Sequence, residues 1–309
     1  MHSPVLSIIF NRPDTTQKVF DVLREVKPPR LFVCAEGPRK GNLNDVLLCK
    51  KAREVYDHID WDCEVHRLYR DSNSGGCGLG VSKAINWFFE HVDKGVILED
   101  DILPHPDFFK FCDEMLEKYS NDTIVKCICG SNVFYDTIKD YPYSYYFSHY
   151  MHVWGWATWK RSWNEYNYSL RSIPKDSFIK NIKKLPIKKG SKRMAFYIYD
   201  KMTSDKPIDT WDYQLTLSIM YKHGVNIIPI TNLCHNIGFG REDATHTKGK
   251  NINVMNHVGR SIYPVNHPPQ IKTTRKLDDI TFSYFSMGNS KWYMLKRMVY
   301  CLLHLLHRI

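Results

Sequence analysis

Apolar runs alternate with amphipathic stretches along the first hundred residues. The apolar run 4–10 predicts a buried strand, and Asp14 or Thr15 is expected to cap a helix that follows it to about residue 26. The same pattern predicts further strands at 30–35, 63–69 and 95–98, and helices at 43–58 and 81–91. Strands that alternate with helices indicate an α/β fold with a mostly parallel central sheet and helices on both faces.

Polar side chains follow three of these strands, at the point where each strand ends. They are Asn11 and Arg12 after the first strand, Glu36 after the second, and Glu99–Asp101 after the strand at 95–98. In parallel sheets, ligands bind beyond the carboxyl ends of the strands. We therefore predict that residues 1–125 form a nucleotide-binding half, with Asn11 among its contacts.

The second half of the chain is less regular and rich in aromatic residues. Trp156, Trp159 and Trp163 recur at helical spacing and could simply belong to the core. The pattern also predicts a helix at 209–223 opened by Asp209 or Thr210, a strand at 225–230, a loop-like stretch at 235–262 and an amphipathic helix at 291–309. We predict that residues 126–262 complete the same domain as its acceptor-binding and catalytic half, and that residues 263–309 form a C-terminal tail.

The charge balance narrows the choice of partner. The 309-residue chain has 43 Lys and Arg against 33 Asp and Glu, a net charge of +10. This balance favours an anionic partner, which could be nucleic acid, acidic lipid or a phosphate-bearing small molecule. The nine cysteines are scattered without a Cys-x-x-Cys pair, so we expect no zinc ribbon or disulfide framework and a cytoplasmic location. With no long apolar run, we expect neither a signal peptide nor a membrane-spanning helix.

Three adjacent carboxylates, Glu99, Asp100 and Asp101, are the sharpest chemical signal. Crowded carboxylates repel one another unless a cation or solvent offsets the repulsion. Oxygen ligands suit Mg²⁺ or Mn²⁺, which use one or two protein carboxylates and complete their shell with phosphate oxygens and water. A solvated helix start with Asp101 as its cap is the alternative.

Four segments occur in an order that resembles a known family. They are Glu99-Asp100-Asp101 with Pro-x-Phe-Phe after it, Val153-Trp-Gly-Trp-Ala-Thr-Trp-Lys160, Trp211-Asp212, and Gly238-Phe-Gly-Arg241. This series resembles the GT-A-fold glycosyltransferases, in the form seen in the N-acetylglucosaminyltransferase I family, and is similar to bacterial glycosyltransferases that build surface polysaccharides. The resemblance covers residues 4–250 and implies a Rossmann-like nucleotide-diphospho-sugar transferase fold.

The resemblance also implies roles for the strand-end residues. Asp101 matches the residue that binds the metal, and Glu99 and Asp100 match residues that support the ribose and metal-bound water. Arg12 matches a nucleotide-contacting arginine. Glu36 stands where many relatives have an Asp against the uracil or ribose.

Four further positions carry open alternatives. Asn73 and Lys83, in and after a Gly-rich loop, could contact the nucleotide, or could be a turn residue and an exposed helix lysine. Arg241 could hold the diphosphate with paired donors. His246 could be a third metal ligand or a structural histidine.

Asp212 matches the catalytic base of the family, which takes the proton of the acceptor hydroxyl in an inverting transfer. Its alternative role is a favourable charge in the first turn of a helix. Trp154 or Trp156 could wall the donor or acceptor sugar, with Gly155 allowing close approach and Trp211 beside the base.

Two segments have the composition of membrane-contacting surfaces: a basic run at 180–193 and the predicted tail helix. Both could contact anionic lipid or a lipid-linked acceptor at the inner face of the plasma membrane. The basic run could instead be a solvated face, and the tail could pack on protein.

These observations predict a Mn²⁺- or Mg²⁺-dependent inverting glycosyltransferase. It would move a sugar from a UDP-sugar, with UDP-N-acetylglucosamine as one candidate, to a glycan or lipid-linked glycan. A sugar-phosphate nucleotidylyltransferase is the competing enzyme class, but those enzymes carry a Gly-rich loop after the first strand and this chain has none there. A nucleic-acid-binding protein is disfavoured because acidic groups gather at the strand ends. Retention of Asp101 and Asp212 disfavours a catalytically dead relative.

Overall fold

The computed structural model describes residues 1–132, 134–138, 140–243 and 261–287. The strands are β1 (Val5–Ile9), β2 (Arg30–Ala35), β3 (Glu64–Tyr69), β4 (Lys94–Glu99), β5 (Ile102–Pro104), β6 (Val125–Cys129), β7 (Tyr145–Ser148), β8 (Trp156–Trp159), β9 (Val225–Pro229) and β10 (Cys234–Asn236). The helices are α1 (Pro13–Val26), α2 (Leu43–Glu54), α3 (Cys77–His91), α4 (Pro106–Lys118), α5 (Lys160–Trp163), α6 (Lys175–Lys184), α7 (Lys189–Met202), α8 (Asp212–Tyr221) and α9 (Arg275–Met287). Short 3-10 turns lie at Val55–His58 and Tyr135–Thr137.

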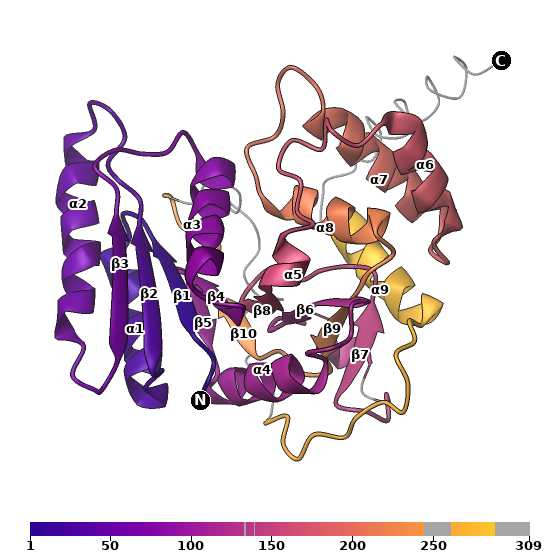
Figure 1. Ribbon diagram of the computed structural model, residues 1–309, viewed down its shortest axis with the longest axis horizontal. Coiled ribbons are helices and arrows are strands. Elements are labelled where there is room, and N and C mark those ends of the chain that lie inside the picture. Colours follow the sequence, from indigo (N-terminus) through magenta and orange to yellow (C-terminus); the bar gives the residue numbers. More distant parts are fainter. Residues whose placement is uncertain (133, 139, 244–260, 288–309) are drawn as a thin grey trace.

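An eight-stranded sheet, in the order β3-β2-β1-β4-β8-β6-β9-β7, forms the centre of the molecule and is flanked by helices (Figure 1). The first four strands are parallel to one another. The chain runs outward from β1 through β2 to β3 and then returns to β4 on the other side of β1. This reversal is the topological switch point of Rossmann-type sheets, where ligands bind beyond the carboxyl ends of the strands.

The second half of the sheet is mixed rather than parallel. β8 runs antiparallel to β4 and β6, and β7 runs antiparallel to β9. Trp156 and Trp159 therefore lie in a strand, and the helical spacing predicted for them is wrong. Because side chains alternate along a strand, residues three apart point to opposite faces. Trp156 packs in one core layer and Trp159 in the other, so their predicted burial is confirmed.

Each face of the sheet carries its own apolar layer. Along β1, Val5 and Ile9 pack with α1 and α4, whereas Leu6 and Ile8 pack with α3 and α8. This alternation explains why the strand is apolar at nearly every position, as expected for a sheet covered on both faces.

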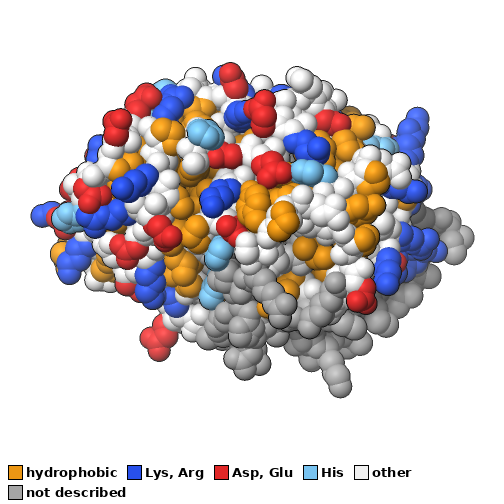
Figure 2. Space-filling view, turned by 90° about the horizontal axis from the view of Figure 1, so that it is seen from below, with side chains coloured by type: hydrophobic (Ala, Val, Ile, Leu, Met, Phe, Trp, Pro, Cys, Tyr) orange, Lys and Arg blue, Asp and Glu red, His pale blue; other side chains and the backbone are white. Residues whose placement is uncertain are grey.

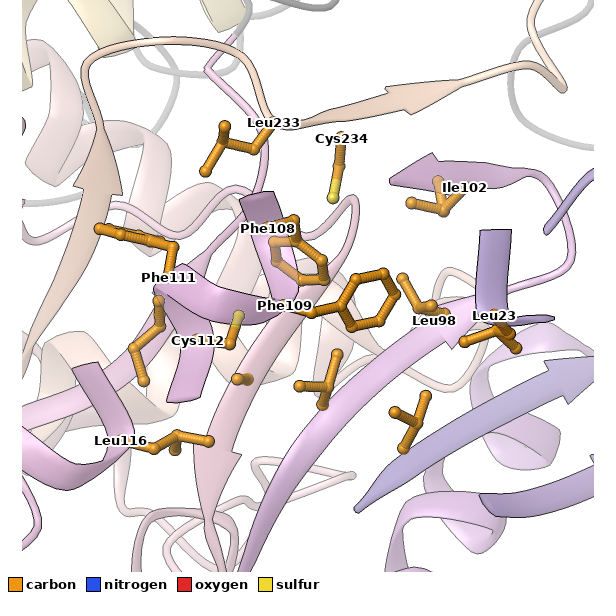
Figure 3. Packing of buried hydrophobic residues seen from close by; sticks show 14 of the residues in the cluster. Leu23, Leu98, Ile102, Phe108, Phe109, Phe111, Cys112, Leu116, Leu233 and Cys234 are labelled. Atoms are coloured by element: carbon orange, nitrogen blue, oxygen red, sulfur yellow. The ribbon is translucent and has the colours of Figure 1, made fainter. Parts of the chain in front are cut away.

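The two phenylalanines that follow the acidic triplet belong to the first layer. Figure 3 shows Phe108 directed toward Cys234 and Phe109 toward Leu98, and both rings are fully buried. A ring of this kind contributes about 3–5 kcal/mol relative to alanine. The Phe-Phe pair thus anchors α4 beneath the strand end that carries the carboxylates.

Several predicted boundaries need correction. α1 begins at Pro13 with no side-chain cap, so neither Asp14 nor Thr15 caps it; proline suits this first position because its φ is already helical. Residues 235 and 236, predicted as loop, belong to β10 (Cys234–Asn236), which pairs with β5. α3 begins at Cys77 rather than at residue 81.

Other expectations stay predictions. The tail helix predicted at 291–309 lies outside the described residues. No helix within the described part of the chain combines the length and the apolar character needed to cross a bilayer. The proposed boundaries at residues 125 and 262 also stay predictions.

Candidate functional site

The ends of β1 and β4 meet at the switch point and bring a guanidinium onto the acidic triplet. Arg12 Nη1 donates to Asp101 Oδ2 at 2.9 Å and lies 4.0 Å from Asp100 Oδ1. The amide of Phe10 donates to Asp100 Oδ2 at 3.2 Å. The structure thus brings together the polar strand ends that the sequence places after two separate strands.

Burial makes this carboxylate group costly to ionise. It raises the pKa of Glu99 well above its usual range, and the neighbouring charges of Asp101, Asp100 and Asp212 raise it further. Burial, followed by the charge of Asp101, raises the pKa of Asp100 to about 7. Burial also raises the pKa of Asp101, although Arg12 opposes the rise. The strand end is therefore short of positive charge.

The donor set fits a hard divalent cation. Asp101 and Asp100 each accept one hydrogen bond, and no described residue donates to the carboxylate of Glu99. Among the described residues no three His, Cys, Asp or Glu side chains converge as metal ligands. Mg²⁺ and Mn²⁺ use one or two protein carboxylates and take the rest of their shell from phosphate and water, so binding of either ion here stays a prediction.

The segment after β10 lies directly on the triplet. The amide of Ile237 donates to the Asp101 carbonyl at 2.8 Å, and a Cβ on Gly238 would overlap the Asp101 carboxylate. This position therefore needs a glycine. The Gly-Phe-Gly-Arg segment is thus placed at the site by its packing against Asp101.

Arg241 contacts Asp14 and Asp243, and Asp243 also contacts Arg12; neither aspartate is among the predicted site residues. Arg241 Nη1 donates to Asp14 Oδ2 at 2.6 Å, and its Nε donates to Asp243 Oδ1 at 2.8 Å. Arg12 Nη2 donates to the Asp243 carbonyl at 3.1 Å. The hydrogen bonds that Arg241 donates to Asp243 and then to Asp14 raise the pKa of its guanidinium. The sequence shows only that Asp14 and Asp243 are acidic residues close in the chain to Arg12 and Arg241. Which aspartate pairs with which arginine is decided by the tertiary fold.

Glu36 lies at the end of β2 but is already engaged by protein. It forms an ion pair with Arg70 and accepts hydrogen bonds from the Ser74 amide at 2.8 Å and the Ser74 hydroxyl at 3.0 Å. These contacts tie the end of β2 to the Gly-rich loop. Asn73, in the same loop, accepts from the amides of Gly75 and Gly76 at 3.2 Å each, which is the geometry of a turn residue.

Asn11 is held by another part of the chain, whereas Lys83 is exposed. Asn11 Nδ2 donates to Asp45 Oδ1 at 2.8 Å. Arg39 and then Asn11 lower the pKa of Asp45 to about 2, so this carboxylate stays ionised and fixes the amide of Asn11. Lys83 lies on the exposed side of α3. Their contacts with a nucleotide stay predictions.

Asp212 is the first residue of α8. The Thr210 hydroxyl and the Tyr213 amide both donate to its Oδ1, the latter at 2.8 Å. Within the described part of the chain, its Oδ2 accepts no hydrogen bond. Asp212 is also one of the charges that raise the pKa of Glu99. The structure therefore places Asp212 within electrostatic reach of the acidic triplet.

The tryptophan cluster is divided between core and site. Trp156 and Trp211 are 1% and 3% exposed and stack with ring centroids 5.5 Å apart. Trp154 is partly exposed and meets the ring of Phe239 edge-on at 5.1 Å. Of the three tryptophans among the four predicted sugar contacts, Trp154 is the one that keeps accessible surface.

Gly155 packs closely against Cys234, next to the tryptophan cluster. It has φ +65°, and a Cβ there would overlap Cys234 Sγ. The close approach predicted for Gly155 is thus made to another part of the chain. A sugar contact at this glycine stays a prediction.

The remaining candidates bear on partners. His246 lies outside the described residues. Figure 2 shows one face of the molecule, and on its described part Lys and Arg side chains are interspersed with Asp and Glu. Nucleic-acid grooves need clustered basic side chains, so this face lends the nucleic-acid alternative no support.

Comparisons with known proteins add little. No protein-family model and no curated protein matches the chain. A solved structure of UDP-glucose pyrophosphorylase complexed with UDP-glucose is 12% identical, with a TM-score of 0.27. The match covers 43% of this chain and 59% of that chain, which is less than two thirds of its length. The resemblance to the N-acetylglucosaminyltransferase I family therefore stays a prediction.

Proposed function

We propose that this chain is a divalent-cation-dependent, inverting glycosyltransferase of the GT-A class that uses a UDP-sugar. One observation carries the proposal. At the switch point of a Rossmann-type sheet, a partly buried triplet of carboxylates lies beside Arg12, the one positive side chain that contacts it in the described part of the chain, and the charge of Asp212 acts on Glu99. The motif resemblance supports the choice of glycosyl transfer within the wider class of enzymes acting on nucleotide sugars.

The triplet would hold the donor through its diphosphate. When bound, the divalent ion supplies positive charge that stabilises the departing diphosphate. Asp101 would be its direct ligand, while Glu99 and Asp100 would hold metal-bound water and the ribose. Arg12 and Arg241 offer guanidinium groups of the geometry that binds phosphate oxygens in pairs.

Asp212 would act on the acceptor. Its carboxylate takes the proton from the acceptor hydroxyl as that oxygen forms a bond to the anomeric carbon. The bond from the anomeric carbon to the diphosphate oxygen breaks on the opposite face, and its electron pair leaves with the UDP. Because the diphosphate leaves as a stabilised anion, one carboxylate base is sufficient and no general acid is needed.

The competing nucleotidylyltransferase function has a specific observation against it. The turn after β1 is Asn11-Arg12-Pro13, and the first helical position is a proline, which has no amide proton. That turn therefore offers few backbone donors for a triphosphate. Formation of pyrophosphate from a sugar 1-phosphate and UTP would favour the competing function.

For the acceptor and the location we propose only a chemical class and a compartment. A glycan or lipid-linked glycan is the proposed acceptor, and the proposed location is cytoplasmic, peripheral to an anionic membrane. Exposed lysines on α6 and α7 are compatible with such a membrane contact; they are Lys180, Lys183, Lys184 and Lys189.

A donor screen tests the function. Each UDP-sugar is incubated with the protein, with Mn²⁺ or with EDTA, and released UDP is measured by chromatography. We expect slow UDP release from one donor that EDTA abolishes and that Asp101→Asn removes. Asp57→Asn, an exposed carboxylate outside the site, is the matched control and should keep full activity. UDP release that is unaffected by EDTA, or its absence with every donor, contradicts the proposal.

A further inference from the structure

Asp209 caps a helix that is distant in sequence. The Gly78 amide donates to Asp209 Oδ1 at 2.8 Å and the Cys77 amide donates to Oδ2 at 3.0 Å. These are the first two amides of α3, which have no partner within the helix. The sequence pattern predicts that Asp209 or Thr210 opens the following helix, but α8 begins only at Asp212.

Two glycines of the Gly-rich loop make this contact possible. A Cβ on Gly76 would overlap the Asp209 carboxylate, and a Cβ on Gly78 would lie 2.5 Å from the Thr210 carbonyl oxygen. The 209–210 segment therefore packs directly against the backbone at the start of α3. In Figure 1 the segment that leads into α8 lies beside α3.

The contact continues to the proposed base. The Thr210 carbonyl accepts from Gln214 Nε2 at 2.5 Å, which holds Thr210 against the first turn of α8. The Thr210 hydroxyl donates to Asp212 Oδ1. The hydrogen bonds of Asp209 and of Thr210, which are adjacent in the chain, thus link α3, in the proposed nucleotide-binding half, to the carboxylate of Asp212.

We propose that Asp209 is a positioning residue that sets the place of Asp212 relative to the nucleotide-binding half. This inference rests on the proposed function for the role of Asp212. The first amides of α3 donate to the carboxylate of Asp209, so they are not available to bind a ligand phosphate. When the hydrogen bonds between Asp209 and the first amides of α3 (the tie) are lost, the Asp212 side chain can move, while the residues proposed to hold the donor stay in place.

A kinetic comparison separates positioning from simple stability. Asp209→Ala should lower kcat for sugar transfer by about tenfold to hundredfold, because small displacements of a catalytic group have large effects on rate. The KM for the donor and the rate of donor hydrolysis by water should change much less, so the ratio of transfer to hydrolysis falls. Asp209→Asn keeps one acceptor oxygen and should recover part of that ratio.

The controls fix the interpretation. Asp205→Ala removes an exposed carboxylate from the same loop and should leave both rates unchanged. Partial unfolding of Asp209→Ala would lower transfer and hydrolysis together. An unchanged ratio of transfer to hydrolysis therefore overturns the positioning role.

A measurement independent of activity tests the tie itself. Cys77 lies at the contact, and burial, with the charges of Glu99, Asp209 and Asp212, raises the pKa of its thiol. Asp209→Ala should speed alkylation of Cys77 by iodoacetamide severalfold, followed by peptide mass spectrometry, with Cys63 as an internal reference. Equal Cys77 labelling in the wild-type protein and Asp209→Ala overturns the proposal. If no UDP-sugar is turned over, the proposed function has failed, and this labelling still decides whether the tie holds.

Discussion

Arg12 and Asp101 form a partly buried ion pair across the switch point, with Nη1 2.9 Å from Oδ2 and side chains 15% and 18% exposed. The guanidinium thus occupies part of the coordination space of the carboxylate that we assign to the metal. A positive side chain in this place relieves the repulsion among the three acids in the absence of a cation. Under the proposed function, Arg12 and a divalent ion would compete for Asp101 until a diphosphate gave Arg12 another partner.

This competition predicts that replacing Arg12 strengthens metal binding and weakens nucleotide binding. Arg12→Ala should tighten Mn²⁺ binding in the absence of nucleotide by about tenfold, since a nearby positive charge is removed. The same substitution should weaken UDP binding in the presence of Mn²⁺. Isothermal titration calorimetry measures both affinities. Arg24→Ala, which removes a surface ion pair with Asp60, is the matched control; equal Mn²⁺ affinity in Arg12→Ala and the wild-type protein contradicts the competition.

The ion pair of Glu36 with Arg70 predicts a structural role for the end of β2. Glu36→Gln leaves the largely buried Arg70 guanidinium without its charge partner, which costs about 3 kcal/mol. Glu64→Gln, which loosens an exposed pair with Arg30, should cost less than about 1 kcal/mol. Urea unfolding of both variants gives the comparison. A smaller loss of stability in Glu36→Gln than in Glu64→Gln would show that the Glu36 pair does not hold the Gly-rich loop.

Gly155 and Gly41 share a left-handed φ but differ in their surroundings. A Cβ on Gly155 would overlap Cys234 Sγ, whereas a Cβ on Gly41 would meet nothing within 4 Å. Gly41→Ala should therefore cost only the backbone strain of about 1 kcal/mol. Gly155→Ala should cost about 2 kcal/mol more because of the overlap in the core. Thermal unfolding distinguishes them, and equal losses of stability would remove the packing argument for Gly155.

Asp278, in α9, predicts a defined pH dependence of stability. Burial raises its pKa to about 7, although the Ser148 hydroxyl, which donates at 2.6 Å, opposes the rise. The folded state therefore holds a proton that the unfolded state releases near pH 4, so the stability from this group is present at low pH and lost as the pH rises to 7.

A neutral substitution isolates that contribution. From pH 5 to pH 8, Asp278→Asn should gain about 2 kcal/mol in the free energy of unfolding relative to the wild-type protein, because the amide has no proton to lose. Asp176→Asn, an exposed acid in α6, is the control and should follow the wild-type curve. Parallel curves for the wild-type protein and Asp278→Asn would contradict the assignment.

The first half of the fold was predictable because its signals are local. Continuous apolar runs mark β1, β2 and β4, and the polar residues after them share one edge of the sheet by topology alone. The placement of Arg12 and the acidic triplet at one edge of the sheet therefore follows from the sequence, whereas their ion pair is known only from the structure. The second half was harder because β7 and β8 have four residues each, too few to separate strand from helix periodicity.

The supporting contacts of the site were not predictable from local pattern. Asp209 looks like a helix cap in sequence, and it is one, but for a helix 131 residues earlier. The partners of Arg241 and Glu36 are likewise set by tertiary packing. A single sequence shows which residue types lie at the strand ends. It does not show which of these charged side chains are paired with other side chains of the protein.

Mn²⁺ binding tests the central claim most directly, because the account requires the β4 carboxylates to bind a cation together with a diphosphate. Electron paramagnetic resonance of free Mn²⁺ is recorded with the protein, with and without UDP. The account predicts a single Mn²⁺ site that UDP strengthens, that Asp101→Asn abolishes and that Asp57→Asn retains. Equal Mn²⁺ binding by Asp101→Asn and the wild-type protein, or binding that UDP leaves unchanged, would contradict it.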